Sequence, residues 1–171
     1  MSIPKEKYTH EYYMTEDVIK HSRQRGFERV DEKHQKLISG FVMPLRGTQF
    51  SAGYDFFLPR EIILKPLTHF LIWTDVKAYM LDDEVLEMHI RSSTAIKHDV
   101  RIKNVVGIID SDYYSNEKND GNIGICLYNF GEKDYYQEKG TGIVQGIFKK
   151  YLVADNCNSD NKRIGGTGST N

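Results

Sequence analysis

Cysteine is scarce in this sequence, and so are long apolar runs and any excess of charge of one sign. The two cysteines, Cys126 and Cys157, form no CxxC pair, so the sequence suggests neither a disulfide framework nor a zinc site. No apolar run approaches the length of a membrane-spanning helix, and the first residues lack the apolar centre of a signal peptide. We therefore expect a protein of the reducing cytoplasm, without a membrane partner.

The charge balance excludes a further class of partner. With 23 basic and 24 acidic residues the formal net charge is −1, which offers no electrostatic footprint for nucleic acid. A chain of 171 residues is long enough to bury a core and is expected to form one main domain.

Short β-type segments separated by turn residues dominate the chain. In "EVLEMHIR" and "NIGICLYN", apolar residues alternate with polar or small ones, which is the pattern of half-buried strands. One helix is predicted near the start, in "TEDVIKHSRQRG", with Thr15 as its cap and Gly26 at its end. The predicted fold class is all-β: a jelly-roll-like antiparallel barrel with a short N-terminal helix and a flexible C-terminal arm.

Five short stretches carry residue types that a β-fold alone does not require. They are "SAGYDFF" (51–57), "RSSTAIK" (91–97), "NVVGIIDSDYYSN" (104–116), "GTGIVQG" (140–146) and "KRIGGTGSTN" (162–171). Each also has a purely structural reading: a turn that enters a strand, an exposed loop, a hairpin cap, a strand with a satisfied amide, and a disordered terminus.

The third stretch is the most informative of the five. Its apolar run from Val105 to Ile109 is expected to be buried, and it ends on Asp110, with Asp112 two residues further on. If the strand persists, both carboxylates lie on one face of it. A carboxylate held among apolar residues has restricted motion and a tuned pKa, which suits a general base.

Taken in this order, the stretches resemble the five motifs of the trimeric dUTP pyrophosphatase (dUTPase) family, in the dUTPase/dCTP deaminase superfamily. "AGYD", "RSS", "GIIDSDY", "GIVQ" and "GGTGST" are similar to motifs one to five. Asn104 precedes Asp110 by six residues, Tyr113 follows it by three, and Arg91 lies nineteen before it, as in the family pattern. The match runs from about Arg46 to the C-terminus and leaves out the first forty or so residues.

The resemblance implies hydrolysis of dUTP to dUMP and pyrophosphate, with Mg²⁺ on the triphosphate and a homotrimer whose subunits share each site. It implies that Asp110 activates the attacking water, that Tyr113 lies under the deoxyribose, and that Asp55 supports the hydrated metal through water. The remaining substrate-binding residues that it implies are Asn104, Arg91, Ser92, Ser93, Gly107, Gln145, Lys162, Arg163, Gly166, Gly168, Ser169 and Thr170. It also divides the chain into an N-terminal extension (1–40), a β-barrel domain (41–157) and a C-terminal lid (158–171).

The sequence departs from the family pattern in four places. Gly142 stands where an arginine is common in motif four, and Thr167 where the family has a phenylalanine that stacks on uracil; Tyr114 is a candidate replacement ring. "SNEKND", Ser115 to Asp120, is inserted into the turn of motif three. In the fifth motif the cation register is shifted, so either Lys162 or Arg163 could reach the γ-phosphate.

Two other functions compete with dUTP hydrolysis. A dCTP deaminase shares the fold, but it requires a glutamate in the strand after motif three, where "NIGICLYN" has Cys126 and no acidic residue. The alternative from another class is a regulatory protein that binds a protein partner in a nucleotide-dependent way. The N-terminal extension and the "SNEKND" insertion are its candidate docking surfaces.

Overall fold

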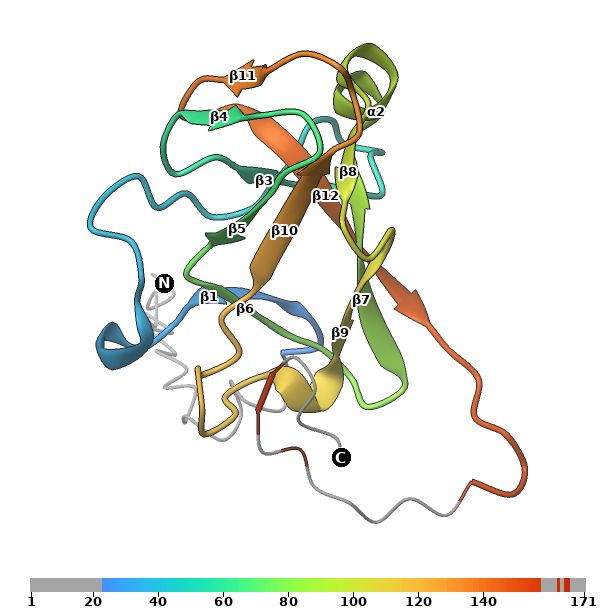
Figure 1. The fold of residues 1–171 in the computed structure, drawn as a ribbon. Helices are drawn as coiled ribbons and strands as arrows, with labels where there is room; N and C mark the ends of the chain where they lie inside the picture. The colour runs from blue at the N-terminus through green and yellow to red at the C-terminus, as the bar shows by residue number, and fades with distance from the viewer. Residues whose placement is uncertain (1–22, 158–162, 164, 167–171) are drawn as a thin grey trace, which may run out of the picture.

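The structure, a computed structural model, describes residues 23–157, 163, 165 and 166 of the chain. In this part of the chain the strands form four sheets, and every strand pair is antiparallel. The strand orders are β1 (Gly26–Arg29) with β6 (Val76–Tyr79); β5 (His69–Trp73), β10 (Gly124–Asn129), β8 (Val100–Ile102); β11 (Tyr135–Gln137) with β4 (Ile62–Leu64); and β2 (Leu45–Arg46), β3 (Tyr54–Phe57), β12 (Gly142–Lys150), β7 (Glu84–Ile90), β9 (Gly107–Asp110). The antiparallel β prediction is therefore confirmed, although the described strands do not close into a barrel (Figure 1).

Helix is confined to short pieces within the described residues. The α-helix α2 (Ser92–His98) directly follows β7, where the sequence suggested only a strand end, and two single 3₁₀ turns, η1 (Glu32–His34) and η2 (Ser111–Tyr113), lie elsewhere. The predicted N-terminal helix lies mostly outside the described residues. Its last part, from Arg23, is not helical, and Gly26 begins β1 instead of ending a helix.

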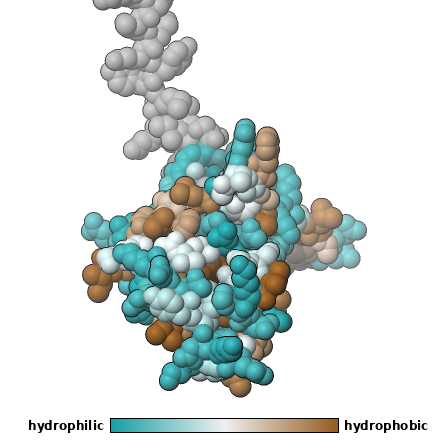
Figure 2. All heavy atoms as spheres, turned by 90° about the horizontal axis from the view of Figure 1, so that it is seen from above, coloured by the Kyte–Doolittle hydropathy of each residue, from teal (hydrophilic) through white to brown (hydrophobic). Residues whose placement is uncertain are grey.

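The core lies between the two larger sheets, which cross in the view of Figure 1. Ile125 and Leu127 of β10 pack with Leu86 and Met88 of β7 in one buried cluster, so the alternation read from both stretches is confirmed. On the outer surface, Figure 2 shows hydrophobic residues scattered among hydrophilic ones.

The expectation of a buried run before Asp110 is wrong. Val105 is 73% exposed and Ile108 53% exposed. The reason is the position of β9 at the edge of its sheet, where it pairs only with β7, so that one face of the strand remains in solvent.

Cys126 and Cys157 are both free thiols, the first partly buried and the second exposed. Within the described residues, no helix has the length and apolarity needed to cross a bilayer.

A buried carboxylate ties the corner between β5 and β6 to two distant segments. Asp75 is fully buried, and its two oxygens accept hydrogen bonds from the backbone N–H of Lys36 at 2.8 Å and of Leu37 at 2.9 Å. The side-chain amide of Asn122 donates to the same carboxylate at 2.9 Å, and its oxygen accepts the backbone N–H of Asp75 at 3.0 Å. Because a buried charge is tolerated only when it is hydrogen-bonded, this residue fixes the geometry of the corner.

We expect Asp75→Ala to lower the free energy of unfolding by about 2–4 kcal/mol, since it leaves buried donors without acceptors. The positive φ of Asp75, 55°, adds to the cost, because alanine adopts that conformation less readily than aspartate. Urea unfolding measures the change. Asp82→Ala, at an exposed position, is the matched control and should stay within about 0.5 kcal/mol of the parent. Equal stability of the two variants would contradict the role of Asp75.

Candidate active site

A cavity of about 410 Å³ opens between β5, β7, β9 and the start of β10. Six residues singled out from the sequence line it: Arg163 and Gly166 of the C-terminal arm, and four that we call the pocket group, Asn104, Gly107, Asp110 and Tyr113. Apolar side chains form much of the remaining wall, among them Trp73 of β5 and Met88 of β7. The cavity therefore combines an apolar wall with one carboxylate and one phenol.

Close backbone packing creates part of the space in this cavity. Gly107 pairs with Met88, and a Cβ atom on Gly107 would lie 3.0 Å from the Met88 Cβ. Gly124 pairs with Trp73, and a Cβ atom there would lie 3.1 Å from the indole ring. These two glycines keep the strands close and leave the backbone of both open to a ligand.

The carboxylates of Asp110 and Asp112 share a cation from the C-terminal arm. Asp110 is the last residue of β9 and Asp112 lies in η2, so the strand does not persist as far as Asp112. Both carboxylates nevertheless meet the guanidinium of Arg163, which donates from Nη2 to Asp110 and from Nε to Asp112, the latter at 2.6 Å. The Asp110 and Asp112 side chains are 46% and 57% exposed, so each pair is worth at most about 1 kcal/mol. A more highly charged ligand could displace Arg163.

Tyr113 is held at its hydroxyl end. The hydroxyl donates to the backbone carbonyl of Asn122 at 2.8 Å and accepts from the side-chain amide of Asn119 at 2.7 Å. Burial raises the pKa of Tyr113, although the Asn119 hydrogen bond and the charge of Arg163 oppose that rise. The phenol therefore stays protonated at neutral pH, and its ring forms a fixed wall of the cavity.

The inserted turn, Ser115 to Asp120, packs into the molecule. Asn116 and Asp120 are buried, whereas Glu117 and Lys118 are exposed. Lys77 donates to Asp120 at 2.8 Å; burial opposes ionisation of that carboxyl, but hydrogen bonds from Lys77 and from the backbone of Asp31 hold its pKa below the ordinary value. The insertion thus contacts Tyr113 through Asn119, and only its exposed residues are available for docking.

A second group of sequence-predicted residues gathers around β3 and β12, and we call it the arginine group: Asp55, Arg91 and Gln145. Gln145 pairs with Asp55 in the sheet, and Arg91 Nε lies 3.4 Å from an Asp55 carboxylate oxygen. Arg91 also donates to the carbonyl of Gly142 at 3.2 Å, in the motif where the family commonly has its own arginine. Ser92 and Ser93 are exposed in the first turn of α2, next to Arg91.

Asp110 of the pocket group and Arg91 of the arginine group lie toward opposite ends of β7. Asp110 pairs with Val85 near the start of that strand, whereas Arg91 follows its last residue, Ile90. At about 3.3 Å per residue, the six steps from Val85 to Arg91 span roughly 20 Å. Asp110 and Arg91 of one chain are therefore far apart, whereas Gly107 and Gln145 pair with the adjacent β7 residues Met88 and His89.

Of the arm glycines, Gly166 lies against the pocket group and Gly165 against the inserted turn. Gly166 lines the cavity, and a Cβ atom on it would lie 3.3 Å from the Tyr113 hydroxyl. A Cβ atom on Gly165 would meet the Lys118 side chain at 2.3 Å. The other predicted arm residues, Lys162, Gly168, Ser169 and Thr170, lie outside the described residues.

Tyr114 is not the replacement ring that the sequence suggested. Its hydroxyl donates to Glu28, its ring packs edge-on against Tyr79, and it does not line the cavity. Burial and the neighbouring Glu28 carboxylate raise the pKa of Tyr114 to about 12. The aromatic side chain that sequence reasoning missed is Trp73, which lines the cavity. As the chain's only tryptophan, at the end of the apolar run in "HFLIW", it carried a signal that could have been weighed.

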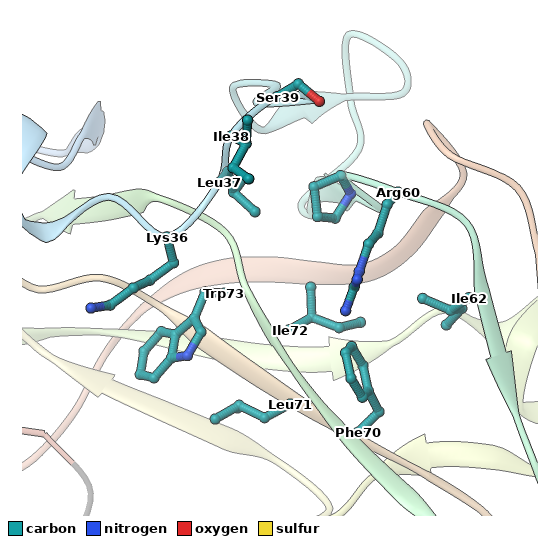
Figure 3. A pocket seen from close by; sticks show the side chains of 11 residues that line it. Lys36, Leu37, Ile38, Ser39, Arg60, Ile62, Phe70, Leu71, Ile72 and Trp73 are labelled. Atoms are coloured by element: carbon teal, nitrogen blue, oxygen red, sulfur yellow. The ribbon is translucent and has the colours of Figure 1, made fainter.

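A separate groove of about 380 Å³ runs beside β5 (Figure 3). Phe70, Ile72 and Trp73 lie along one side of it and Leu37 and Ile38 along the other. Its lining contains two cations, Lys36 and Arg60, and no carboxylate, so it lacks the acid–base groups of the first cavity.

One cluster has the composition of a metal site. Potential ligand atoms of Asp31, His34 and Asp120 lie within 4.8 Å of one another. The ammonium of Lys77 already lies 2.8 Å from Asp120 and 3.8 Å from Asp31, so a cation of the protein itself balances these carboxylates. We therefore assign no metal there.

The protein is thus an antiparallel β-protein in which a carboxylate and a tyrosine border a largely apolar cavity, beside a glycine-containing arm. The chain belongs to the dUTPase family, whose model matches residues 40–170. Sequence and structure comparisons agree with this assignment.

Among curated proteins, the deoxyuridine 5'-triphosphate nucleotidohydrolase of Lactococcus lactis subsp. lactis is 41% identical over 148 residues, which cover 85% of this chain and 97% of that protein. The Treponema denticola protein of the same name is 32% identical over 146 residues, covering 81% of this chain and 97% of the relative. The crystal structure of the dUTPase from Streptococcus mutans superposes with a TM-score of 0.66 at 34% identity, covering 77% of this chain and 99% of that one.

Proposed function

We propose that this chain is a dUTP diphosphatase, which hydrolyses dUTP to dUMP and pyrophosphate by attack of water on the α-phosphorus. The observation that carries the proposal is Asp110, a carboxylate at the rim of an apolar cavity, beside Tyr113 and within reach of an arm arginine. The family membership and the names of the relatives agree with this activity.

Asp110 acts as the general base. The water oxygen forms a bond to the α-phosphorus while the bond from that phosphorus to the α,β-bridging oxygen breaks, and the water proton passes to the Asp110 carboxylate. Pyrophosphate leaves and dUMP remains. Before substrate binds, Arg163 bridges Asp110 and Asp112, one positive charge between two carboxylates. Because these ion pairs are weak at partly exposed carboxylates, a triphosphate competes for the guanidinium and frees Asp110 to orient water.

The pocket group takes the nucleoside. The backbone of Gly107, at the start of the edge strand β9, and that of Asn104, in the turn before it, offer polar groups to the uracil edge, and the Asn104 amide adds to them. Tyr113 lies under the deoxyribose. Ser92, Ser93, Arg91 and Gln145 hold the phosphates, together with the arm cations and hydroxyls.

Magnesium fits the oxygen donors that the arginine group offers. Asp55 supplies a carboxylate and Gln145 an amide oxygen, the ligand types that Mg²⁺ prefers, but too few for a complete protein cage. Asp55 would therefore hold a hydrated ion through water, with the triphosphate completing its shell. Bound there, Mg²⁺ supplies neutralisation of phosphate charge. The Asp55 carboxylate meanwhile keeps Arg91 in place.

The separation of Asp110 from Arg91 along β7 supports a shared site in a homotrimer. If the arginine group of one subunit faces the pocket group of the next, each site becomes complete. We further propose that residues 41–157 form a jelly-roll-like barrel domain, with residues 1–40 as an extension and residues 158–171 as a lid. The antiparallel strand order supports the barrel, and the contacts of Arg163 and Gly166 at the pocket group support the lid.

The activity is tested by pyrophosphate release from dUTP compared with dTTP, dCTP and UTP, with and without Mg²⁺. Selective release from dUTP is expected. Absence of release from dUTP, or ammonia release from dCTP, would overturn the proposal.

For Asp110→Asn we expect a loss of turnover of about 10²-fold or more, because asparagine cannot accept the water proton. The side chain is 46% exposed and outside the buried core, so the thermal midpoint should remain that of the parent. Stopped assays of pyrophosphate and a thermal melt measure the two effects. Near-normal turnover by this variant would remove Asp110 from the role of base.

A complementation experiment tests the shared site. Asp110→Asn and Arg91→Ala should each be nearly inactive alone, whereas subunits mixed by refolding should recover activity, because about a quarter of randomly mixed sites combine both native residues. Native mass spectrometry verifies that mixed assemblies have formed, and the refolded single variants are the controls. Mixed assemblies without recovered activity would place both residues in one chain's site.

Removal of residues 165–171 tests the lid. Turnover should fall by about 10-fold or more, since closure excludes water and positions the triphosphate, while stability should change little. Unchanged turnover in the shortened chain would refute a lid in this segment.

A further inference from the structure

The Tyr113 hydroxyl has no spare hydrogen-bonding capacity on the side of the inserted turn. It gives its proton to the carbonyl of Asn122 and accepts the amide of Asn119, at 2.8 and 2.7 Å. The same Asn119 amide also donates to the Asn122 carbonyl at 3.2 Å. The three groups form a closed triangle, so the end of the ring is fixed from two directions.

Asn119 is itself fully constrained. Its side-chain oxygen accepts the Asn116 amide at 2.8 Å and the backbone N–H of Gly121 at 3.2 Å, so its amide nitrogen must face Tyr113. Asn116, which is buried, also donates to the Tyr113 carbonyl at 2.8 Å. Both asparagines of the inserted turn therefore donate hydrogen bonds to Tyr113, Asn119 to its hydroxyl and Asn116 to its carbonyl.

The arm approaches the same point. A Cβ atom on Gly166 would lie 3.3 Å from the Tyr113 hydroxyl and 3.8 Å from the Asn119 amide nitrogen. Tyr113 is therefore enclosed by Asn119, Asn122 and the arm, and the ring has little room to swing away from the cavity.

We propose that Asn119 is a positioning residue, which holds Tyr113 rigidly with its hydroxyl saturated and thereby makes the sugar side of the site reject a ribose. The inference rests on the proposed function, because it assigns to the inserted turn the choice between dUTP and UTP. Asn119 itself does not line the cavity and acts through Tyr113.

The selectivity follows from two consequences of the triangle. A ring that cannot move leaves no space for a 2′-hydroxyl, and a saturated phenol oxygen offers no acceptor to the ribose hydroxyl that would be buried against it. A buried hydroxyl without a partner is costly, by an amount that corresponds to roughly 10- to 100-fold in specificity. Loss of the Asn119 donor both loosens the ring and exposes an acceptor.

The decisive variant is Asn119→Asp. It preserves the size of the side chain and the oxygen that accepts from Asn116 and Gly121, but its carboxylate cannot donate to Tyr113. The ratio of kcat/KM for dUTP to kcat/KM for UTP is measured, because the two substrates differ only in the 2′-hydroxyl and any effect of the added charge cancels. The ratio should fall about 10- to 100-fold, mainly because kcat/KM for UTP rises. The kcat for dUTP should stay within about threefold of the parent value. Glu117→Gln, exposed in the same turn, is the control and should keep the parent ratio.

Tyr113→Phe removes the same hydrogen bonds from the other partner and should lower the ratio as well. The kcat/KM ratio of the double variant should be no lower than that of the less selective single variant, since both changes break the hydrogen bond between Asn119 and Tyr113. An unchanged ratio in either single variant, or additive losses in the double variant, would overturn the inference. If Asn119→Asp does not fold, the ratio is measured for Asn119→Ala, which also removes the donor to Tyr113. A parent without activity on dUTP would overturn the proposed function itself, whereas an active parent with insensitive variants would overturn only the role of Asn119.

Discussion

Asn122 joins the interior of this protein to its cavity, and the arrangement of both depends on it. Its side chain exchanges hydrogen bonds with the buried Asp75, which in turn holds the backbone at Lys36 and Leu37. Its backbone carbonyl accepts the hydroxyl of Tyr113. Because polar groups this deep must be satisfied, movement of one would break several bonds at once. The wall that Tyr113 forms is thereby held by the same hydrogen-bond network as the buried Asp75.

The opposite side of the site is held more loosely. Arg163 binds two carboxylates that remain about half exposed, and such pairs contribute little against water and salt. The protein therefore combines a rigid wall for recognising the nucleoside with an arm contact that a triphosphate can displace. That division suits a hydrolase, in which the base and sugar are selected by shape and the phosphates by charge.

The site and the fold were predictable from the sequence to different degrees. The motif spacing identified Asn104, Asp110 and Tyr113, and the structure brings all three to one cavity. The alternation in β7 and β10 was read correctly because each of these strands has one face in the core. The run before Asp110 was misread as buried because apolar residues at a sheet edge resemble buried ones in sequence. Tyr114 was misassigned because its direction depends on Glu28 and Tyr79, which are distant in the chain.

By itself, the sequence determined the antiparallel β class, the family and the residues of the motifs, since local alternation and fixed spacing are properties of the chain order. Only the tertiary structure decided which of these residues meet. Pairing along β7 places Asp110 and Arg91 at opposite ends of one strand, although they are only nineteen positions apart in the chain. Long-range pairing likewise brought Asn119 to Tyr113 and Trp73 to the cavity. Register and side-chain direction depend on partners far along the chain, and no local pattern contains that information.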